Sequence, residues 1–393
     1  MNILYVAMRY DYGIKERGLS FEHYNFFDSL DHLGVNISYF DFMTEMQDHG
    51  KKEMNRSLLQ KVKEEAPDLM FTVLFKDEIE KSTLNSITRG TETTTVNWFC
   101  DDHWRFDNYS RYYAPCFDHV VTTAQSALPK YREMGFKNVI KSQWACNHFL
   151  YQRMDLPLEH DMTFIGQPHS DRRQVIAAIR AAGIPAQTWG NGWEGGRVDQ
   201  ADMIRLFNQS RINLNLSNSS LPITGSTSPL QKYGWKAGKI LRRLPGGSAA
   251  ISSVKMAVDM VGKGTGSPKQ ISPRSGGTIY REQIKGRNFE VPGCGGFVLT
   301  SGVQELDNYF QVGKEVVCYE DTADLIEKAK YFLRNEEERR AIADAGYKRT
   351  LAEHTYLHRF KEIFQEVGLS HLSHNLLFDS ADQASEIDTH QLT

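Results

Sequence analysis

The chain has 393 residues, of which 40% are hydrophobic and 24% are charged, and this near-average composition excludes a disordered or collagen-like protein. Its length favours two domains, its net charge of −3 excludes a uniformly polyanion-binding molecule, and no apolar run reaches the ~18 residues that a membrane span needs. Five dispersed cysteines without a C-x-x-C pair indicate reduced thiols, so we expect a cytoplasmic protein with neither a disulfide framework nor a zinc site.

Strand and helix patterns alternate through the first 150 residues. Apolar or β-branched runs predict strands at 3–8, 35–42, 68–75, 93–100, 119–123 and 138–143. Apolar residues at helical spacing predict helices at 19–33, 58–65 and 126–134. Because strands alternate with helices, we expect a parallel, doubly wound α/β sheet, and we assign residues 1–155 to a first Rossmann-like domain.

The alternation lapses in a polar, proline-containing stretch at 151–158, which we interpret as a linker, and then restarts. Strands are predicted at 162–165, 186–189 and 212–216, helices at 171–182 and 199–209, and further elements at 296–300, 303–310, 315–319, 323–333 and 336–353. A second Rossmann-like domain is therefore expected over 156–353. Residues 370–393 have few apolar positions and are expected to form a mobile tail.

Positive charge is concentrated in one segment of the second domain. Residues 221–287 contain twelve basic and two acidic side chains, and they are rich in Gly, Pro and Ser. We predict a basic insertion over 221–285, forming a long loop. One interpretation is a docking surface for an anionic acceptor, nucleic acid or an anionic membrane surface; the other is a solvated loop whose charge attracts a diphosphate.

Two segments of the second domain carry residue types that suit a nucleotide. In open α/β sheets, ligands bind at the carboxyl ends of strands. Gly166 follows a predicted strand there, and Arg172 and Arg173 open the next helix. Glycine permits close backbone approach to a phosphate and the arginines supply charge, although a tight turn with two solvated arginines explains the same pattern.

The second segment, residues 282–297, combines two acidic and two basic residues with a glycine cluster: Glu282, Lys285, Arg287 and Glu290 precede 293–296. Cations suit a diphosphate, and a carboxylate accepts hydrogen bonds from ribose hydroxyls. The alternative is a surface helix with a mixed-charge face that ends at the glycines.

Polar residues at strand ends of the first domain are candidates for an acceptor side. Asp101, Asp102 and His103 follow the predicted strand 93–100 and are candidate general bases. In an extended chain only one of the two carboxylates faces the ligand, and the other reading is a helix cap. Less specific candidates are Arg17 and Gly18 before the first helix and His148 after a later strand, where a solvated loop and a structural histidine are the alternatives.

The chain resembles the spore-maturation-protein-B-like glycosyltransferases, which have the two-Rossmann-domain GT-B fold. The matching stretches lie at 97–106, 141–147, 212–217, 283–297 and 339–358. The resemblance implies transfer of a hexose or pentose from a UDP- or GDP-sugar to a hydroxyl-bearing acceptor, in carbohydrate biosynthesis on a glycan, glycolipid or other glycoconjugate.

The resemblance also implies roles for individual residues. Residues 282–290 look like the Glu-x7-Glu signature of retaining GT-B enzymes, in which Glu282 would face the donor sugar and Glu290 the ribose. GT-B enzymes generally lack a metal-binding Asp-x-Asp motif, so no metal and no cofactor is expected, and the segment 354–369 would be the helix that crosses back onto the first domain. Two other functions remain open: a nucleotide-sugar epimerase or hydrolase of the same fold, and a non-catalytic nucleic-acid- or glycan-binding protein that uses the basic insertion.

Overall fold

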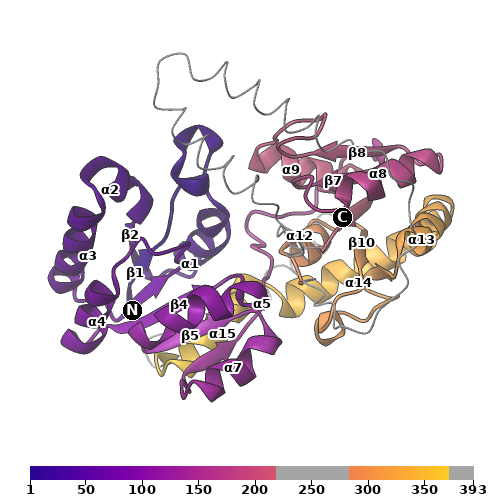
Figure 1. Ribbon diagram of the computed structural model, residues 1–393. Helices are drawn as coiled ribbons and strands as arrows, with labels where there is room; N and C mark the ends of the chain where they lie inside the picture. Colours follow the sequence, from indigo (N-terminus) through magenta and orange to yellow (C-terminus); the bar gives the residue numbers. More distant parts are fainter. Residues whose placement is uncertain (218–282, 371–393) are drawn as a thin grey trace, which may run out of the picture. The chain divides into compact units, whose positions relative to one another are not determined.

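A computed structural model describes residues 1–217 and 283–370 (Figure 1). Residues 221–282 of the predicted basic insertion, Glu282 among them, and residues 371–393 of the predicted tail lie outside the described residues. In the part of the chain that is described, no helix combines the length and the apolar character needed to cross a membrane.

The first half of the chain forms a six-stranded parallel sheet in the order β2-β1-β3-β4-β5-β6. Its strands are β1 (Asn2–Val6), β2 (Asn36–Phe40), β3 (Leu69–Thr72), β4 (Thr94–Phe99), β5 (His119–Thr122) and β6 (Val139–Lys141). The chain adds β2 on one side of β1 and β3 on the other, so the topological switch point lies between β1 and β3.

Helices cover both faces of this sheet because alternate strand residues point to opposite sides. In β1, Leu4 and Val6 belong to the same buried cluster as residues of α3 (Lys51–Glu65) and α4 (Lys81–Gly90), whereas Ile3 and Tyr5 belong to the cluster of the opposite face. The sequence patterns do not predict α4 or α2 (Phe42–His49). The remaining α-helices of this half are α1 (Asp28–His32), α5 (Asp102–Arg105), α6 (Arg111–Tyr113) and α7 (Leu128–Glu133).

The second half of the chain forms a five-stranded parallel sheet in the order β11-β10-β9-β7-β8. Its strands are β7 (His160–Ile165), β8 (Ala186–Trp189), β9 (Ser210–Asn215), β10 (Val298–Ser301) and β11 (Val317–Tyr319). The helices between and after them are α8 (Arg172–Ala181), α9 (Gln200–Asn208), α12 (Arg287–Gly293), α13 (Thr322–Arg334) and α14 (Glu336–Glu353). The switch point lies between β7 and β9, and the prediction of two doubly wound parallel sheets is confirmed.

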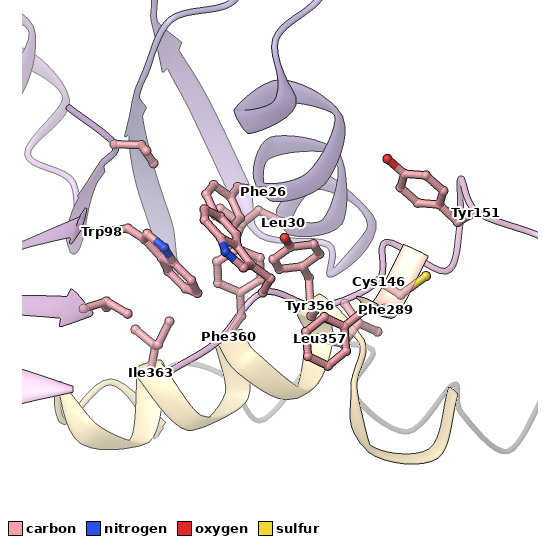
Figure 2. Packing of buried hydrophobic residues seen from close by; sticks show 14 of the residues in the cluster. Phe26, Leu30, Trp98, Cys146, Tyr151, Phe289, Tyr356, Leu357, Phe360 and Ile363 are labelled. Carbon is pink, nitrogen blue, oxygen red and sulfur yellow. The ribbon is translucent and has the colours of Figure 1, made fainter. Parts of the chain in front are cut away.

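The last described helix, α15 (Tyr356–Glu366), packs against residues of the first half of the chain. Figure 2 shows Tyr356 and Phe360 of this helix beside Phe26 and Trp98, and the Phe26 and Tyr356 ring centroids lie 5.1 Å apart. The Arg359 Nε also donates a hydrogen bond to the carbonyl oxygen of Gln143 at 3.1 Å. Aromatic packing and this charged anchor together hold α15 on the first sheet.

Candidate active site

The switch point of the second sheet brings together the ends of β7 and β9. Gly166 directly follows β7, and Leu216 directly follows β9. At such a point the connections leave toward opposite faces of the sheet, which opens a crevice outside the carboxyl ends of the strands. The structure places several of the residues expected to bind a donor beside these strand ends.

Arg172, the first residue of α8, spans this switch point. Its side chain is buried, with 6% of the residue exposed, and its guanidinium Nη1 donates to the carbonyl oxygen of Gln167 at 2.9 Å. Nη2 donates to the carbonyl oxygen of Leu216 at 2.7 Å. Burial lowers the pKa of Arg172 to about 10, and the nearby Arg287 contributes to that shift. The arginine is therefore a charged group held at a fixed place between the two strand ends.

Two more cations enter the same region from the start of α12. Asn288 Oδ1 accepts hydrogen bonds from the Lys285 backbone N–H at 3.0 Å and from Asn215 Nδ2 at 2.9 Å, which ties this turn to β9. A Cβ atom at Gly166 would lie 3.4 Å from the Arg287 guanidinium Nη2, so the glycine backbone and this cation are immediate neighbours. Lys285, Arg287 and Arg172 thus meet at the crevice.

The three cations of this cluster repel one another and are partly removed from water. Burial lowers the pKa of Lys285 to about 8, Arg172 and Arg287 act in the same direction, and Asp101 opposes them. Desolvated like charges favour an anionic ligand, because it replaces part of the lost hydration and offsets the repulsion between the cations. Arginine and lysine together suit the oxygens of a diphosphate.

Glu290 lies one helical turn after Arg287 and is 4% exposed. Burial raises the pKa of its carboxyl to about 7, while Arg287 and a hydrogen bond with Tyr151 oppose the increase. Gly286 makes room for this carboxyl, since a Cβ atom there would lie 2.7 Å from Glu290 Oε1. The carboxyl therefore lies inside the protein next to Arg287, and not on the exposed face of a surface helix.

Arg173, the other predicted arginine, is directed elsewhere. Its Nη2 donates to the carbonyl oxygen of Gly192 at 2.6 Å, and its guanidinium lies 5.0 Å from the centroid of the Trp193 ring. Although adjacent in sequence to Arg172, it fixes the loop that follows β8. Glu282, the predicted partner of the donor sugar, lies outside the described residues.

The loop after β8 packs closely on the backbone that follows β7. The Gly166 N–H donates to the carbonyl oxygen of Trp189 at 2.8 Å. Gly190 has φ +128°, and a Cβ atom there would lie 2.2 Å from the Gly166 carbonyl oxygen. Only glycine satisfies both conditions, so this residue determines how closely the two loops approach.

A concave site lies at the switch point of the first sheet. It is a pocket of about 190 Å³ at the carboxyl ends of β1, β3 and β4. Aromatic and charged side chains line it, including Asp11, Tyr12, Glu22, Phe75, Asp101 and Arg105. This is the half of the chain in which we expected an acceptor.

The two adjacent aspartates have different environments. Asp101 lines the pocket, and Gln283 Nε2 donates to its Oδ1 at 3.4 Å. Asp102 is 2% exposed, its Oδ2 accepts a hydrogen bond from the Tyr131 hydroxyl at 2.8 Å, and burial raises the pKa of Asp102 to about 6. Only Asp101 faces the pocket, while Asp102 lies in the core. The cause is not the alternation of an extended chain, because the backbone turns at Asp101 (φ −130°, ψ 30°) and Asp102 is the first residue of α5.

The other acceptor-side candidates are not gathered in the pocket. Burial and Lys285 lower the pKa of His103 to about 4, so this imidazole is near the cation cluster. His148 packs against Phe149 with tilted rings whose centroids lie 4.1 Å apart, and burial lowers the pKa of His148 to about 4. The Arg17 carbonyl oxygen accepts from Arg197 Nη2 at 2.8 Å, and Gly18 has φ +81°, so both serve the loop between β1 and α1.

Three residues that line the pocket were missed by the sequence analysis: Asp11, Tyr12 and Glu22. Asp11 and Tyr12 follow a predicted strand closely, so the rule that selected Asp101 would also have selected them. No sequence pattern pointed to Glu22, because apolar residues at helical spacing around Phe21 predict a helix but do not show which of its polar residues faces the pocket.

A family model described as glycosyl transferase-like matches residues 172–236 and 249–365, somewhat less than half of the chain. The matched ranges include Arg172, Lys285, Arg287 and Glu290. No curated protein matches the chain.

Solved structures share the fold over nearly the whole chain. Sucrose-phosphate synthase from Thermosynechococcus elongatus has a TM-score of 0.56 at 9% identity, covering 94% of this chain and 100% of that one. Anabaena HepE in complex with UDP and glucose has a TM-score of 0.54 at 10% identity, covering 94% and 99%. A glycosyltransferase from Rickettsia africae has a TM-score of 0.53 at 10% identity, covering 93% and 98%. The chain therefore has the GT-B fold, with two Rossmann-like domains.

Proposed function

We propose that the protein is a glycosyltransferase that moves a sugar from a nucleoside diphosphate donor to a hydroxyl-bearing acceptor. The observation that carries this proposal is the cluster of Arg172, Lys285 and Arg287 at the switch point of the second sheet. The glycosyl transferase-like match to this half of the chain and the GT-B fold support it. Binding of UDP by HepE, a protein of the same fold, supports a nucleotide as the ligand.

The cations suit the chemistry at the leaving group. As the bond between the anomeric carbon and the diphosphate breaks, negative charge grows on the departing oxygen. Cations already in position would stabilise that charge more than they stabilise the ground state, because they require no reorganisation during the reaction. Glu290 would accept hydrogen bonds from the ribose, and the pocket of the first sheet would hold the acceptor.

Several finer features belong to this proposal. We propose metal-independent transfer without a cofactor, because the three cations supply the charge that a divalent metal would otherwise provide. We also propose a UDP- or GDP-linked hexose or pentose as the donor, a glycan or glycoconjugate as the acceptor, and a cytoplasmic location. Membership of the spore-maturation-protein-B-like group rests on the sequence motifs at 97–106 and 283–297.

A nucleotide-sugar epimerase or hydrolase of the same fold would need no acceptor site. The lined pocket at the first sheet favours a transferase over both, since it offers hydrogen-bond acceptors and aromatic rings for a second substrate. Binding of nucleic acid or an anionic surface through residues 221–287 falls largely outside the described residues.

A thermal-shift screen of the full chain against UDP, GDP, CMP and their sugars tests the proposal. A ligand that binds only the folded state at about 100 times its Kd adds roughly 2.7 kcal/mol to the free energy of unfolding. We expect a nucleoside diphosphate to raise the melting temperature and its sugar to be turned over with release of the nucleotide. Absence of a shift with every nucleotide would overturn the proposal.

A further inference from the structure

Hydrogen bonds fix the position of Glu22 beside the carboxyl end of β1. Ser20 Oγ donates to the Met8 carbonyl oxygen at 2.7 Å and accepts from the His23 N–H at 3.0 Å, which anchors the start of the helix to the end of the strand. The Tyr5 hydroxyl donates to the Glu22 carbonyl oxygen at 2.9 Å. These bonds hold the backbone of Glu22 where its side chain lines the pocket together with Asp101.

The surroundings of the Glu22 carboxyl hold its proton more strongly than water does. Burial raises the pKa of Glu22 to about 7, Asp11 and Asp101 act in the same direction, and a hydrogen bond with Ser20 opposes them. The ionisable groups that face it come from four places in the fold: Tyr5 in β1, Asp11 and Tyr12 after β1, Tyr39 in β2, and Cys100, Asp101 and Arg105 after β4.

The pocket offers a neutral, hydroxylated ring a better environment than it offers an anion. Asp11 and Asp101 accept hydrogen bonds but repel negative charge, and Arg197 Nη1 pairs with Asp11 Oδ2 at 2.9 Å. The Tyr12 and Phe75 rings meet edge to face with centroids 5.4 Å apart, giving an apolar wall for the C–H face of a sugar. About 190 Å³ suits one ring rather than a drug-sized ligand.

We propose that Glu22 is the general base of the transfer and that its substrate is a hydroxyl of a neutral polyhydroxylated acceptor. In this step the acceptor oxygen forms a bond to the anomeric carbon of the donor sugar, and its proton passes to the Glu22 carboxylate. The bond from that carbon to the diphosphate breaks, and its electron pair leaves with the diphosphate. The inference rests on the proposed function and adds a residue and an acceptor class to it.

Glu22 suits this role better than the neighbouring carboxylates. Asp102 is in the core beside Tyr131, Asp11 pairs with Arg197, and Asp101 accepts from Gln283. A carboxyl whose pKa lies near neutral pH is ionised in a large fraction of the molecules there and accepts a proton more readily than an ordinary carboxylate.

The test compares wild type with E22Q, using the full chain, and E133Q as the matched control on an exposed helical position. Release of UDP or GDP from the nucleotide sugar that binds most tightly is measured with neutral methyl glycosides and with sugar phosphates as acceptors. We expect E22Q to bind the nucleotide as wild type does but to lose roughly 10²- to 10⁴-fold in kcat. Wild-type kcat should rise with pH up to about 7, and this rising limb of the pH profile should be absent in E22Q. Neutral acceptors should give faster release of the nucleotide than phosphorylated ones.

Each other outcome decides between the two proposals. If wild type binds and turns over the donor but E22Q retains both its rate and the rising limb, the role of Glu22 is wrong and the proposed function stands. If no nucleotide binds or none is released from any nucleotide sugar, the proposed function falls and the inference falls with it. If E22Q does not fold, the pH profile of wild type decides, and a kcat that does not rise with pH up to about 7 would refute the role of Glu22.

Discussion

The Arg172 guanidinium donates a hydrogen bond to the carbonyl oxygen of Leu216 at 2.7 Å, which joins the first residue of α8 to the residue that follows β9. The bond crosses the switch point of the second sheet and holds a charged side chain where ligands bind in this class of fold. Because Lys285 and Arg287 lie in the same region, the protein keeps three cations close together, and an anionic ligand would offset their repulsion. The proposed donor site follows from this relationship.

The buried carboxyl of Asp102 should make stability depend on pH. Its pKa is raised from 3.8 to about 6, so the folded state holds a proton that the unfolded chain releases between about pH 4 and 6. Stability from this group is present below about pH 4 and is lost as pH rises through 6, by on the order of 3 kcal/mol. D102N should lack this loss, as measured by urea unfolding across the window.

D101N is the matched control, because it makes the same change on the adjacent residue that lines the pocket. The difference in unfolding free energy between wild type and D102N should narrow or reverse as pH rises from 4 to 6. Parallel pH curves for wild type and D102N would show that Asp102 is not the buried proton-holding group.

Gly190 should tolerate no side chain. In G190A the new Cβ atom would meet the Gly166 carbonyl oxygen at 2.2 Å, in addition to the cost of φ +128°. G183A is the control, because Gly183 has φ +83° and open space around it. Its destabilisation should come from the backbone conformation alone, on the order of 1 kcal/mol. We expect thermal denaturation to show a clearly larger drop in melting temperature for G190A than for G183A, and we expect G190A to bind UDP more weakly. Equal drops in the two variants would show that the contact with the Gly166 carbonyl oxygen does not limit the residue at position 190.

Binding of a nucleoside diphosphate should weaken as pH rises through about 8. Lys285 loses its proton in the free protein around that pH, and the neutral amine gives up its charge-assisted contact with the phosphate. The phosphate itself is already fully ionised there, so the lysine dominates the trend. Titrations of UDP between pH 7 and 9.5 should show falling affinity in wild type and a flatter curve in K285R; a flat wild-type curve would exclude Lys285 from the site.

Much of the fold was predictable because the strands are short, apolar and flanked by turn residues. Thr94–Phe99 and Ala186–Trp189 match their predicted ranges closely, and alternation alone indicated parallel sheets. Helix α2 was not predicted, because only three apolar residues occur in Phe42–His49 and the local signal is the cap at Asp41, whose Oδ1 accepts from the Met43 and Thr44 N–H groups.

The candidate site was also predictable only in part. Arg172 and Arg287 lie 115 positions apart, and different signals selected them: a position after a strand end for Arg172, and a mixture of charged residues and glycines for Arg287. What the sequence does not contain is direction: Arg172 and Arg173 are adjacent, but the first turns to Leu216 and the second to Gly192. Side-chain orientation at a helix start depends on packing against other elements, so only the structure separates the two arginines.

Calorimetric titration of UDP into wild type, K285A and R173A tests the central claim most directly. One charged hydrogen bond contributes roughly 1.5–3 kcal/mol, so K285A should bind about 10- to 100-fold more weakly, while it remains folded because it loses a desolvated cation. R173A should bind like wild type, because its guanidinium contacts Gly192 and Trp193. Equal affinities for wild type and K285A, or no binding of any nucleoside diphosphate to wild type, would contradict a donor site at this crevice.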